Sequence, residues 1–227
     1  MKIKQIFYLC ALAALSTSCL PKNDPQPNLY SSSLGTVENY TNSTLFKLIC
    51  DDETVLNIIK TNAPSSFIAK TGQRMAISYY LINEDDASKP EKNVHLVDGI
   101  IYPTRNLLPL TEAVADTVGN DPVRNVAMYI GSHFLNVQFE FGANNQQHSI
   151  EMVRDSLIAP ASQDTVKLQF RHNSHNDWQT QYYRSIICFD IAEVQGFATS
   201  RDSVFVEVSV MEYGSTQPKK YNLVYKF

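Results

Sequence analysis

The chain has 227 residues, with 19 Lys and Arg side chains against 23 Asp and Glu, and a formal net charge of −4 at pH 7. This length allows one large or two small domains, and the acidic balance without a basic cluster argues against nucleic-acid binding. Tyr and Phe together account for 23 residues, whereas glycine occurs 8 times. The composition therefore favours strands over helices and leaves no glycine-rich loop to hold a phosphate.

The N-terminal segment, residues 1–18, has the layout of a secretory signal peptide. Two lysines precede an apolar run at 6–15, and small residues at 16–18 lead into Cys19. The apolar run is too short to span a bilayer, and a cysteine after small residues is what lipoprotein processing requires. We predict that Cys19 becomes the lipidated N-terminus and anchors the chain to the membrane through several acyl chains. The alternative is an ordinary signal peptide cleaved beside Cys19.

The next two segments differ sharply in composition. Residues 19–28 carry three prolines and little apolar content, which predicts an extended, flexible tether. Residues 29–105 are predicted to contain four or five strands, with candidates at 30–40, 44–49, 54–59, 74–82 and 94–102. Five short strands with little helix predict a small barrel of the OB type.

Residues 106–227 are predicted to form a seven-stranded, immunoglobulin-like β-sandwich. From Leu135 to Phe141, apolar residues alternate with Asn136, Gln138 and Glu140, which indicates a strand with one buried face. The seven strand candidates lie at 126–130, 134–141, 149–154, 166–170, 182–191, 204–210 and 221–227. The pattern predicts the sandwich architecture but lacks the Cys…Trp…Cys spacing of true antibody domains. We expect residues 110–121 to connect the two domains.

Two cysteines remain once Cys19 is lipidated and residues 1–18 are removed. Cys50 and Cys188 each lie in an apolar, strand-like run. An oxidising envelope would permit a disulfide between them. We favour two separate buried thiols, because the two residues belong to different predicted domains.

The segment Arg171–Trp178 is the most polar cluster and is predicted to be a loop between two strands. His172, His175 and Asp177 could ligate a metal, but the Asn, Ser and Asp residues are also ordinary turn formers. We favour the polar loop and predict no metal, no other cofactor and no catalytic residue.

Aromatic residues accompany this loop. Trp178 and Tyr182 beside Asn and Gln are typical of a carbohydrate platform, whereas Trp178 could also belong to a core or a lid. His172, His175, Trp178 and Tyr182 are accordingly the candidate ligand-binding residues.

Four triplets combine Asp, a hydroxyl residue and an apolar residue, and they begin at Asp116, Asp155, Asp164 and Asp202. They resemble an O-glycosylation acceptor motif of envelope proteins in some anaerobes. They are equally typical of a turn that ends before a strand. Both interpretations stay open.

Several stretches resemble the NigD-like lipoproteins of Gram-negative anaerobes. They are the Cys19 signal, Asp116-Thr-Val-Gly-Asn-Asp-Pro-Val123, Tyr129-Ile-Gly-Ser-His-Phe-Leu-Asn-Val-Gln-Phe139, Leu168-Gln-Phe-Arg-His-Asn173 and Ser185-Ile-Ile-Cys-Phe-Asp-Ile191. The resemblance covers most of the chain after Cys19. It implies an N-terminal OB-like domain and a C-terminal β-sandwich, and the family name derives from a bacteriocin-associated operon.

These observations lead to three functional hypotheses. No nucleophile motif, glycosidase carboxylate pair or phosphate loop is visible, so we predict a non-enzymatic outer-membrane lipoprotein whose β-domains bind a protein or a glycan. It would face the periplasm or the cell surface. The second hypothesis, from the family name, is a bacteriocin immunity or export accessory. The third is a hydrolase or metal-dependent enzyme centred on His172 and His175.

Overall fold

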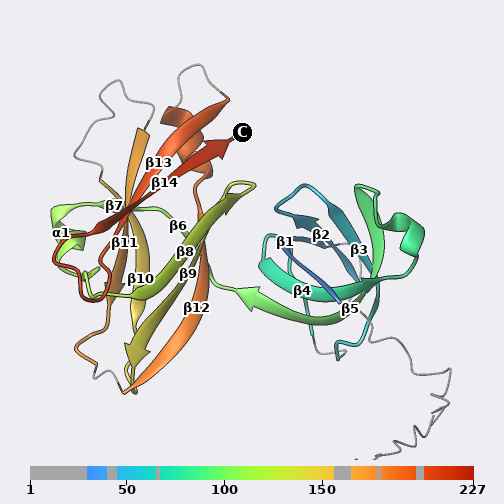
Figure 1. Ribbon diagram of the computed structural model, residues 1–227, viewed down its shortest axis with the longest axis horizontal. Coiled ribbons are helices and arrows are strands. Elements are labelled where there is room, and N and C mark those ends of the chain that lie inside the picture. The colour runs from blue at the N-terminus through green and yellow to red at the C-terminus, as the bar shows by residue number, and fades with distance from the viewer. Residues whose placement is uncertain (1–29, 40–44, 65–66, 156–164, 178–179, 198–201) are drawn as a thin grey trace, which may run out of the picture.

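A computed structural model describes residues 30–39, 45–64, 67–155, 165–177, 180–197 and 202–227, which form two β-domains (Figure 1). An OB-like closed barrel is followed by a β-sandwich, so the predicted fold class is confirmed. Within these ranges no helix has both the length and the apolar character needed to cross a membrane. The predicted signal peptide, Cys19 and the tether lie outside the described residues.

The barrel consists of five strands that match the five sequence candidates. They are β1 (Ser31–Asn39), β2 (Phe46–Cys50), β3 (Val55–Thr61), β4 (Arg74–Leu81) and β5 (Glu91–Tyr102). The closed order is β1-β2-β3-β5-β4, in which only β3 and β5 run parallel. Inward-facing residues such as Phe46 and Leu48 are fully buried, and closure of the sheet leaves no unpaired edge.

The described part of the sandwich contains nine strands in two sheets. They are β6 (Thr104–Asn106), β7 (Leu108–Leu110), β8 (Arg124–Gly131), β9 (Phe134–Ala143), β10 (Ser149–Asp155), β11 (Thr165–Asn173), β12 (Gln181–Asp190), β13 (Ser203–Val210) and β14 (Lys219–Lys226). One sheet has the order β14-β13-β11-β10-β7 and the other the order β6-β12-β9-β8. Seven of these strands are the predicted ones. Side chains such as Phe139, Phe170 and Phe189 interlock between the sheets.

The two additional strands, β6 and β7, connect the two sheets of the sandwich. β6 pairs in parallel with β12 of one sheet, and β7 pairs in parallel with β10 of the other. Leu107 lies between them and is buried in the sandwich core. The chain that leaves the barrel therefore enters one sheet, crosses at Leu107 and joins the second sheet. Three-residue strands carry too little alternation to be predicted from sequence.

A buried polar cluster joins the barrel to the sandwich. Arg74 of β4 is completely buried; its Nη1 lies 2.7 Å from Asp51 Oδ1, and its Nη2 donates to Asn136 Oδ1 at 3.0 Å. Asn136 Nδ2 donates in turn to Asp51 Oδ2 at 3.2 Å, and the guanidinium lies 4.6 Å from the centre of the Phe134 ring. We call Asp51, Arg74 and Asn136 the joint cluster. It places a paired charge between the domains, where an unpaired one would be costly.

The joint also explains a departure from the predicted alternation of β9. Asn136 occupies the polar face of that strand, yet it is only 1% exposed. Its end of the strand carries the barrel, so both faces are covered there. The two thiols lie near the joint as well: Cys188 interacts with Arg74, and Cys50 precedes Asp51 in sequence. Cys50 and Cys188 are free and buried, as favoured from the sequence.

Candidate functional site

His172 belongs to a strand rather than to the predicted loop, because β11 extends to Asn173. Its ring is 2% exposed, and its Nε2 lies 2.8 Å from Nδ1 of His148. Nε2 of His148 lies 3.3 Å from Oδ2 of Asp177. We call Asp177, His148 and His172 the histidine chain. The antiparallel register of β10 and β11 brings these residues together, since Ser149 is paired with Asn173.

The hydrogen bonds indicate where the protons lie. The Asn144 amide donates to Asp177 at 2.6 Å, and this bond holds the pKa of the Asp177 carboxyl below its usual value. Burial lowers the pKa of His172 to about 4, so its ring is neutral. The ionised Asp177 therefore accepts a hydrogen bond from Nε2–H of His148. Nδ1 of His172 then has no hydrogen-bond partner among the described residues.

His175 does not join this chain. It is exposed with a φ of 52°, and its backbone N–H donates to Asn173 Oδ1 in a tight turn. Within the described part of the chain, no group of three His, Cys, Asp or Glu residues is arranged to hold a metal ion. Trp178 lies outside the described residues, so its predicted role in a carbohydrate platform stays a prediction.

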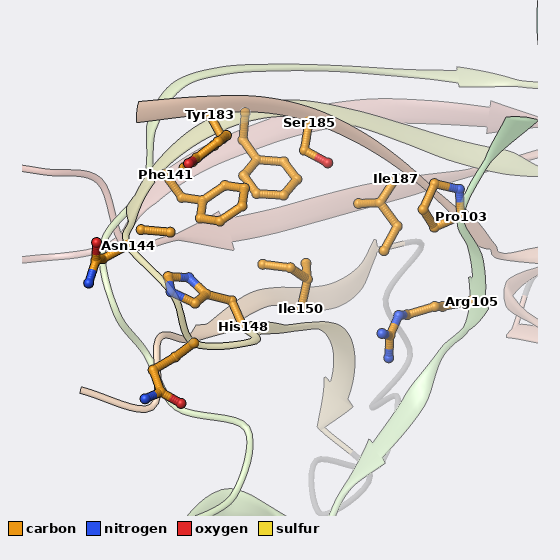
Figure 2. Close-up of a pocket in the computed structure, with 12 residues that line it drawn as sticks. Pro103, Arg105, Phe141, Asn144, His148, Ile150, Tyr183, Ser185 and Ile187 are labelled. Carbon is orange, nitrogen blue, oxygen red and sulfur yellow. The ribbon is translucent and has the colours of Figure 1, made fainter. Parts of the chain in front are cut away.

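A pocket of about 390 Å³ opens between the two sheets beside the histidine chain. Figure 2 shows His148 and Ile150 on one side of this space and Phe141, Ser185 and Ile187 on the other. Its apolar lining consists of Pro103, Phe139, Phe141, Ala143, Ile150 and Ile187. Arg105 lies at the end opposite His148. A volume of this order is typical of small-molecule sites.

The outer face of the same sheet carries Tyr182. Neighbouring residues of a strand point to opposite faces, so Tyr183 lines the pocket whereas Tyr182 faces outward. Arg124 stacks between two tyrosines: its guanidinium lies 3.8 Å from the Tyr182 ring centre and 4.8 Å from that of Tyr213. Arg124 Nη2 also donates to the Tyr182 hydroxyl at 2.8 Å. We call Arg124, Tyr182 and Tyr213 the tyrosine–arginine stack.

The stack is both exposed and held in place. Tyr182 is 49% exposed and Tyr213 58%. Gly142 stands opposite Tyr182 on β9 and adds no side chain between Tyr182 and Arg124 on β8. The amide of Tyr213 donates to the carbonyl of Val123, next to Arg124, at 2.8 Å. The arrangement suits recognition of a flat or hydroxyl-rich surface, because each ring offers an apolar face and a polar edge.

The sequence pattern pointed to Tyr182 and His172 as candidates, and it did not indicate the residues that contact them. His148 directly precedes a predicted strand, and its contact with His172 follows only from the register of β10 and β11. Arg124 and Tyr213 are distant from Tyr182 in sequence. Arg124 meets Tyr182 across β9, and the bridge between Val123 and Glu212 brings Tyr213 beside Arg124. No local pattern marks either contact.

The four Asp–hydroxyl triplets lie in different settings. Thr117 is exposed and its hydroxyl donates to the Val114 carbonyl at 2.8 Å, as in an ordinary helical turn. Ser203 is the first residue of β13 and Thr165 is the first residue of β11. Ser156 lies outside the described residues. The placement of Ser203 fits a turn before a strand, whereas the residues that precede Thr165 lie outside the described ranges. Glycosylation stays a hypothesis that intact mass of natively produced protein would test.

Comparison with known families decides the relationship of the chain. Residues 34–98 match the model described as the NigD-like N-terminal OB domain. Residues 106–223, more than half of the chain, match the NigD-like C-terminal beta sandwich domain. The chain belongs to the NigD-like family. The resemblance noted in the sequence is thereby confirmed, and the matched NigD-like descriptions name folds rather than an activity.

Solved structures share the NigD-like architecture over nearly the whole chain. A candidate toxin-related protein of Parabacteroides distasonis is 22% identical with a TM-score of 0.71, covering 87% of this chain and 93% of its own. A NigD-like immunity protein of Bacteroides caccae is 17% identical with a TM-score of 0.68, covering 86% and 96%. A candidate lipoprotein of Bacteroides fragilis is 13% identical with a TM-score of 0.59, covering 87% and 98%. At these identities the likeness shows a common fold. No curated protein matches the chain.

Proposed function

We propose that this chain is a lipid-anchored outer-membrane protein that binds a protein or a glycan and has no enzymatic activity. The observation that carries the proposal is the tyrosine–arginine stack on the outer face of the sandwich. Tyr and Arg are enriched among the residues that dominate binding energy at interfaces. A platform of aromatic faces with hydroxyl and guanidinium donors also suits a sugar ring.

Preorganisation strengthens the case for this surface. The Arg124 side chain is fixed between two rings and by its hydrogen bond to Tyr182. Immobilising a rotamer-rich side chain on binding costs about 0.5–1.5 kcal/mol, and a side chain that is already fixed avoids most of that cost. The stack would therefore engage a partner with little further ordering.

The membrane anchor is the second part of the proposal. It is supported by the sequence of residues 1–19 and by the related fold of the Bacteroides fragilis protein named a candidate lipoprotein. Replacing Cys19→Ser is expected to release the protein from the membrane fraction and to abolish labelling with radioactive palmitate. Protease treatment of intact cells then separates the two orientations, because a surface-facing chain is digested and a periplasmic one is protected.

The ligand is tested with the full chain on a glycan array and in pull-downs from envelope extracts. We expect a specific partner whose capture falls at least tenfold in Tyr182→Ala and Tyr213→Ala. Tyr30→Ala, which removes an equally exposed tyrosine from the barrel, is the matched control and should bind normally. No partner in either assay, or a partner whose capture survives both substitutions, would overturn the proposed role of the stack.

The second candidate function is immunity to a bacteriocin, or its export. It rests on the fold shared with the Bacteroides caccae protein named a NigD-like immunity protein. Deletion of the gene should then raise sensitivity to toxins of neighbouring strains, and reintroduction of the chain should restore resistance. Unchanged sensitivity would eliminate this candidate.

A further inference from the structure

The pocket between the sheets exists because one core-facing position of β12 carries a small polar residue. Tyr183, Ser185, Ile187 and Phe189 share the inward face of this strand. Ser185 stands opposite Phe139 of β9, where a large apolar side chain would close the core. The short Ser185 side chain lines the space that is left between the sheets instead.

The shape of the space restricts what it can hold. One wall consists of side chains of β9 and β12, including Phe141 and Ile187, and the other includes Ile150 of β10 (Figure 2). Facing sheets of a sandwich lie about 10 Å apart, so a body inserted between them must be thin. The Phe141 ring, 5.1 Å from the His148 ring centre, adds an aromatic surface on which a flat molecule can stack.

Arg105 gives the pocket lining a positively charged group, and Glu151, which lies outside the lining, compensates part of that charge. The net charge of the chain is −4, yet the lining includes the cation Arg105 and no carboxylate. Arg105 of β6 reaches across to Glu151 of β10 and pairs with it through Nη1. A guanidinium has five N–H donors, so this pairing leaves others for a second acceptor. A ligand carboxylate could accept charge-assisted hydrogen bonds from the remaining N–H groups of the Arg105 guanidinium.

We propose that this pocket binds a small organic anion with a flat, apolar body, such as an aromatic carboxylate. Its ring lies between Phe141 and Ile150, and its carboxylate binds Arg105. The hydroxyl of Ser185 supplies a polar contact to a substituent of the ring. This site is distinct from the tyrosine–arginine stack, which occupies the opposite face of the same sheet, and it does not depend on the function proposed for that stack.

Two probes with the same ring and different charge test the proposal: 2-naphthoate and its uncharged amide, 2-naphthamide. Each is titrated into the full chain by isothermal titration calorimetry. We expect naphthoate to bind roughly tenfold more tightly than naphthamide, which corresponds to a single well-placed ionic contact. Arg105→Gln should remove this difference while leaving naphthamide binding unchanged. The matched control is Arg154→Gln, which breaks another Arg–Glu pair of β10 away from the lining and should change neither affinity.

A filled pocket provides the second arm. Ser185→Phe places a large side chain into the space and should abolish binding of both probes, with a cooperative thermal transition as proof of folding. Should that variant fail to fold, Ile150→Trp fills the space from the opposite sheet. Three outcomes overturn the proposal: no binding of either probe at 10 mM, equal affinities in the unmodified chain, or unchanged affinity in a folded, filled variant.

Discussion

The two buried polar clusters of this protein differ in the ionisation state of their buried groups. The joint cluster holds a guanidinium and a carboxylate in contact between the domains, whereas the histidine chain keeps His172 neutral within the sandwich. A buried ion pair fails when one partner is removed, because the other charge is left without compensation. A buried neutral imidazole destabilises the folded protein when it is protonated, because its new charge has no compensation. The first cluster is therefore sensitive to mutation and the second to pH.

The largest effect is expected at the joint. Arg74→Met should lower the free energy of unfolding by about 3–5 kcal/mol, because it leaves Asp51 without its buried partner. Chemical denaturation measures the loss. The double variant Arg74→Met with Asp51→Leu should recover part of it, since it removes the stranded charge as well. A loss below about 1 kcal/mol in the single variant would contradict this account.

Acidification should act on the histidine chain. The pKa of His172 falls from 6.5 in the unfolded chain to about 4 in the folded protein, so the unfolded state binds the extra proton between these values. Stability is fully present above pH 6.5 and should decrease by on the order of 3 kcal/mol as the pH falls to 4. Denaturation curves across this range measure the slope.

The control separates His172 from other titrating groups. His172→Gln should reduce the slope between pH 6.5 and 4, of which a part remains because burial also lowers the pKa of His95. His175→Gln, at an exposed turn, should leave the slope unchanged. The pKa values of Asp121 and Asp177 are lowered from 3.8, so their contributions are lost at still lower pH. An unaltered slope in His172→Gln would refute the assignment.

A smaller effect is expected where the backbone of β8 approaches the joint. A Cβ atom on Gly131 would lie well inside van der Waals contact of the Asp51 carboxylate. Gly131→Ala should therefore displace Asp51 from Arg74 and cost about 1–3 kcal/mol. Gly196→Ala is the matched control, because nothing lies within 4 Å of the added atom. Equal stability of the two variants would argue against close packing at the joint.

The smallest effect on stability is expected when an exposed arginine, rather than the buried Arg74, is replaced by methionine. Arg184 pairs with Glu140 at 2.8 Å, but its side chain is 67% exposed. Arg184→Met should leave the free energy of unfolding unchanged within experimental error, since exposed ion pairs contribute little. Comparison with Arg74→Met isolates the contribution of burial. Similar losses in the two variants would mean that burial of the pair is not what matters.

The sequence predicted the elements better than their contacts. Alternation along β9 and β13 identified strands because each has one face toward the core. The same alternation predicts that Asn136 faces solvent. This prediction is wrong, because a strand pattern carries no information about a second domain that covers the polar face. The Asn, Ser and Asp residues around His172 predict a loop, whereas pairing with β10 continues the strand through Asn173.

The candidate site depends on contacts between residues far apart in the chain. Arg124 meets Tyr182 at a separation of 58 residues, and Arg105 meets Glu151 at a separation of 46. Neither pair has a local signature. Ser185 is an exception, because a serine between Tyr183 and Ile187 on an inward face departs from the expected apolar pattern. Such a departure can mark a cavity before the structure is known.

The pairing of β6 and β7 with different sheets of the sandwich has a mechanical consequence. Tension applied through the barrel enters the sandwich at Thr104, where β6 and then β7 pair in parallel with β12 and β10. A pull along these strands shears several interstrand hydrogen bonds at once instead of opening them one after another. The force is also shared by both sheets. The ion pair between Arg105 of β6 and Glu151 of β10 links the two sheets beside the pocket. In a chain tethered at its N-terminal end, tension that passes through the barrel would reach the sandwich through these two strands and through the joint cluster.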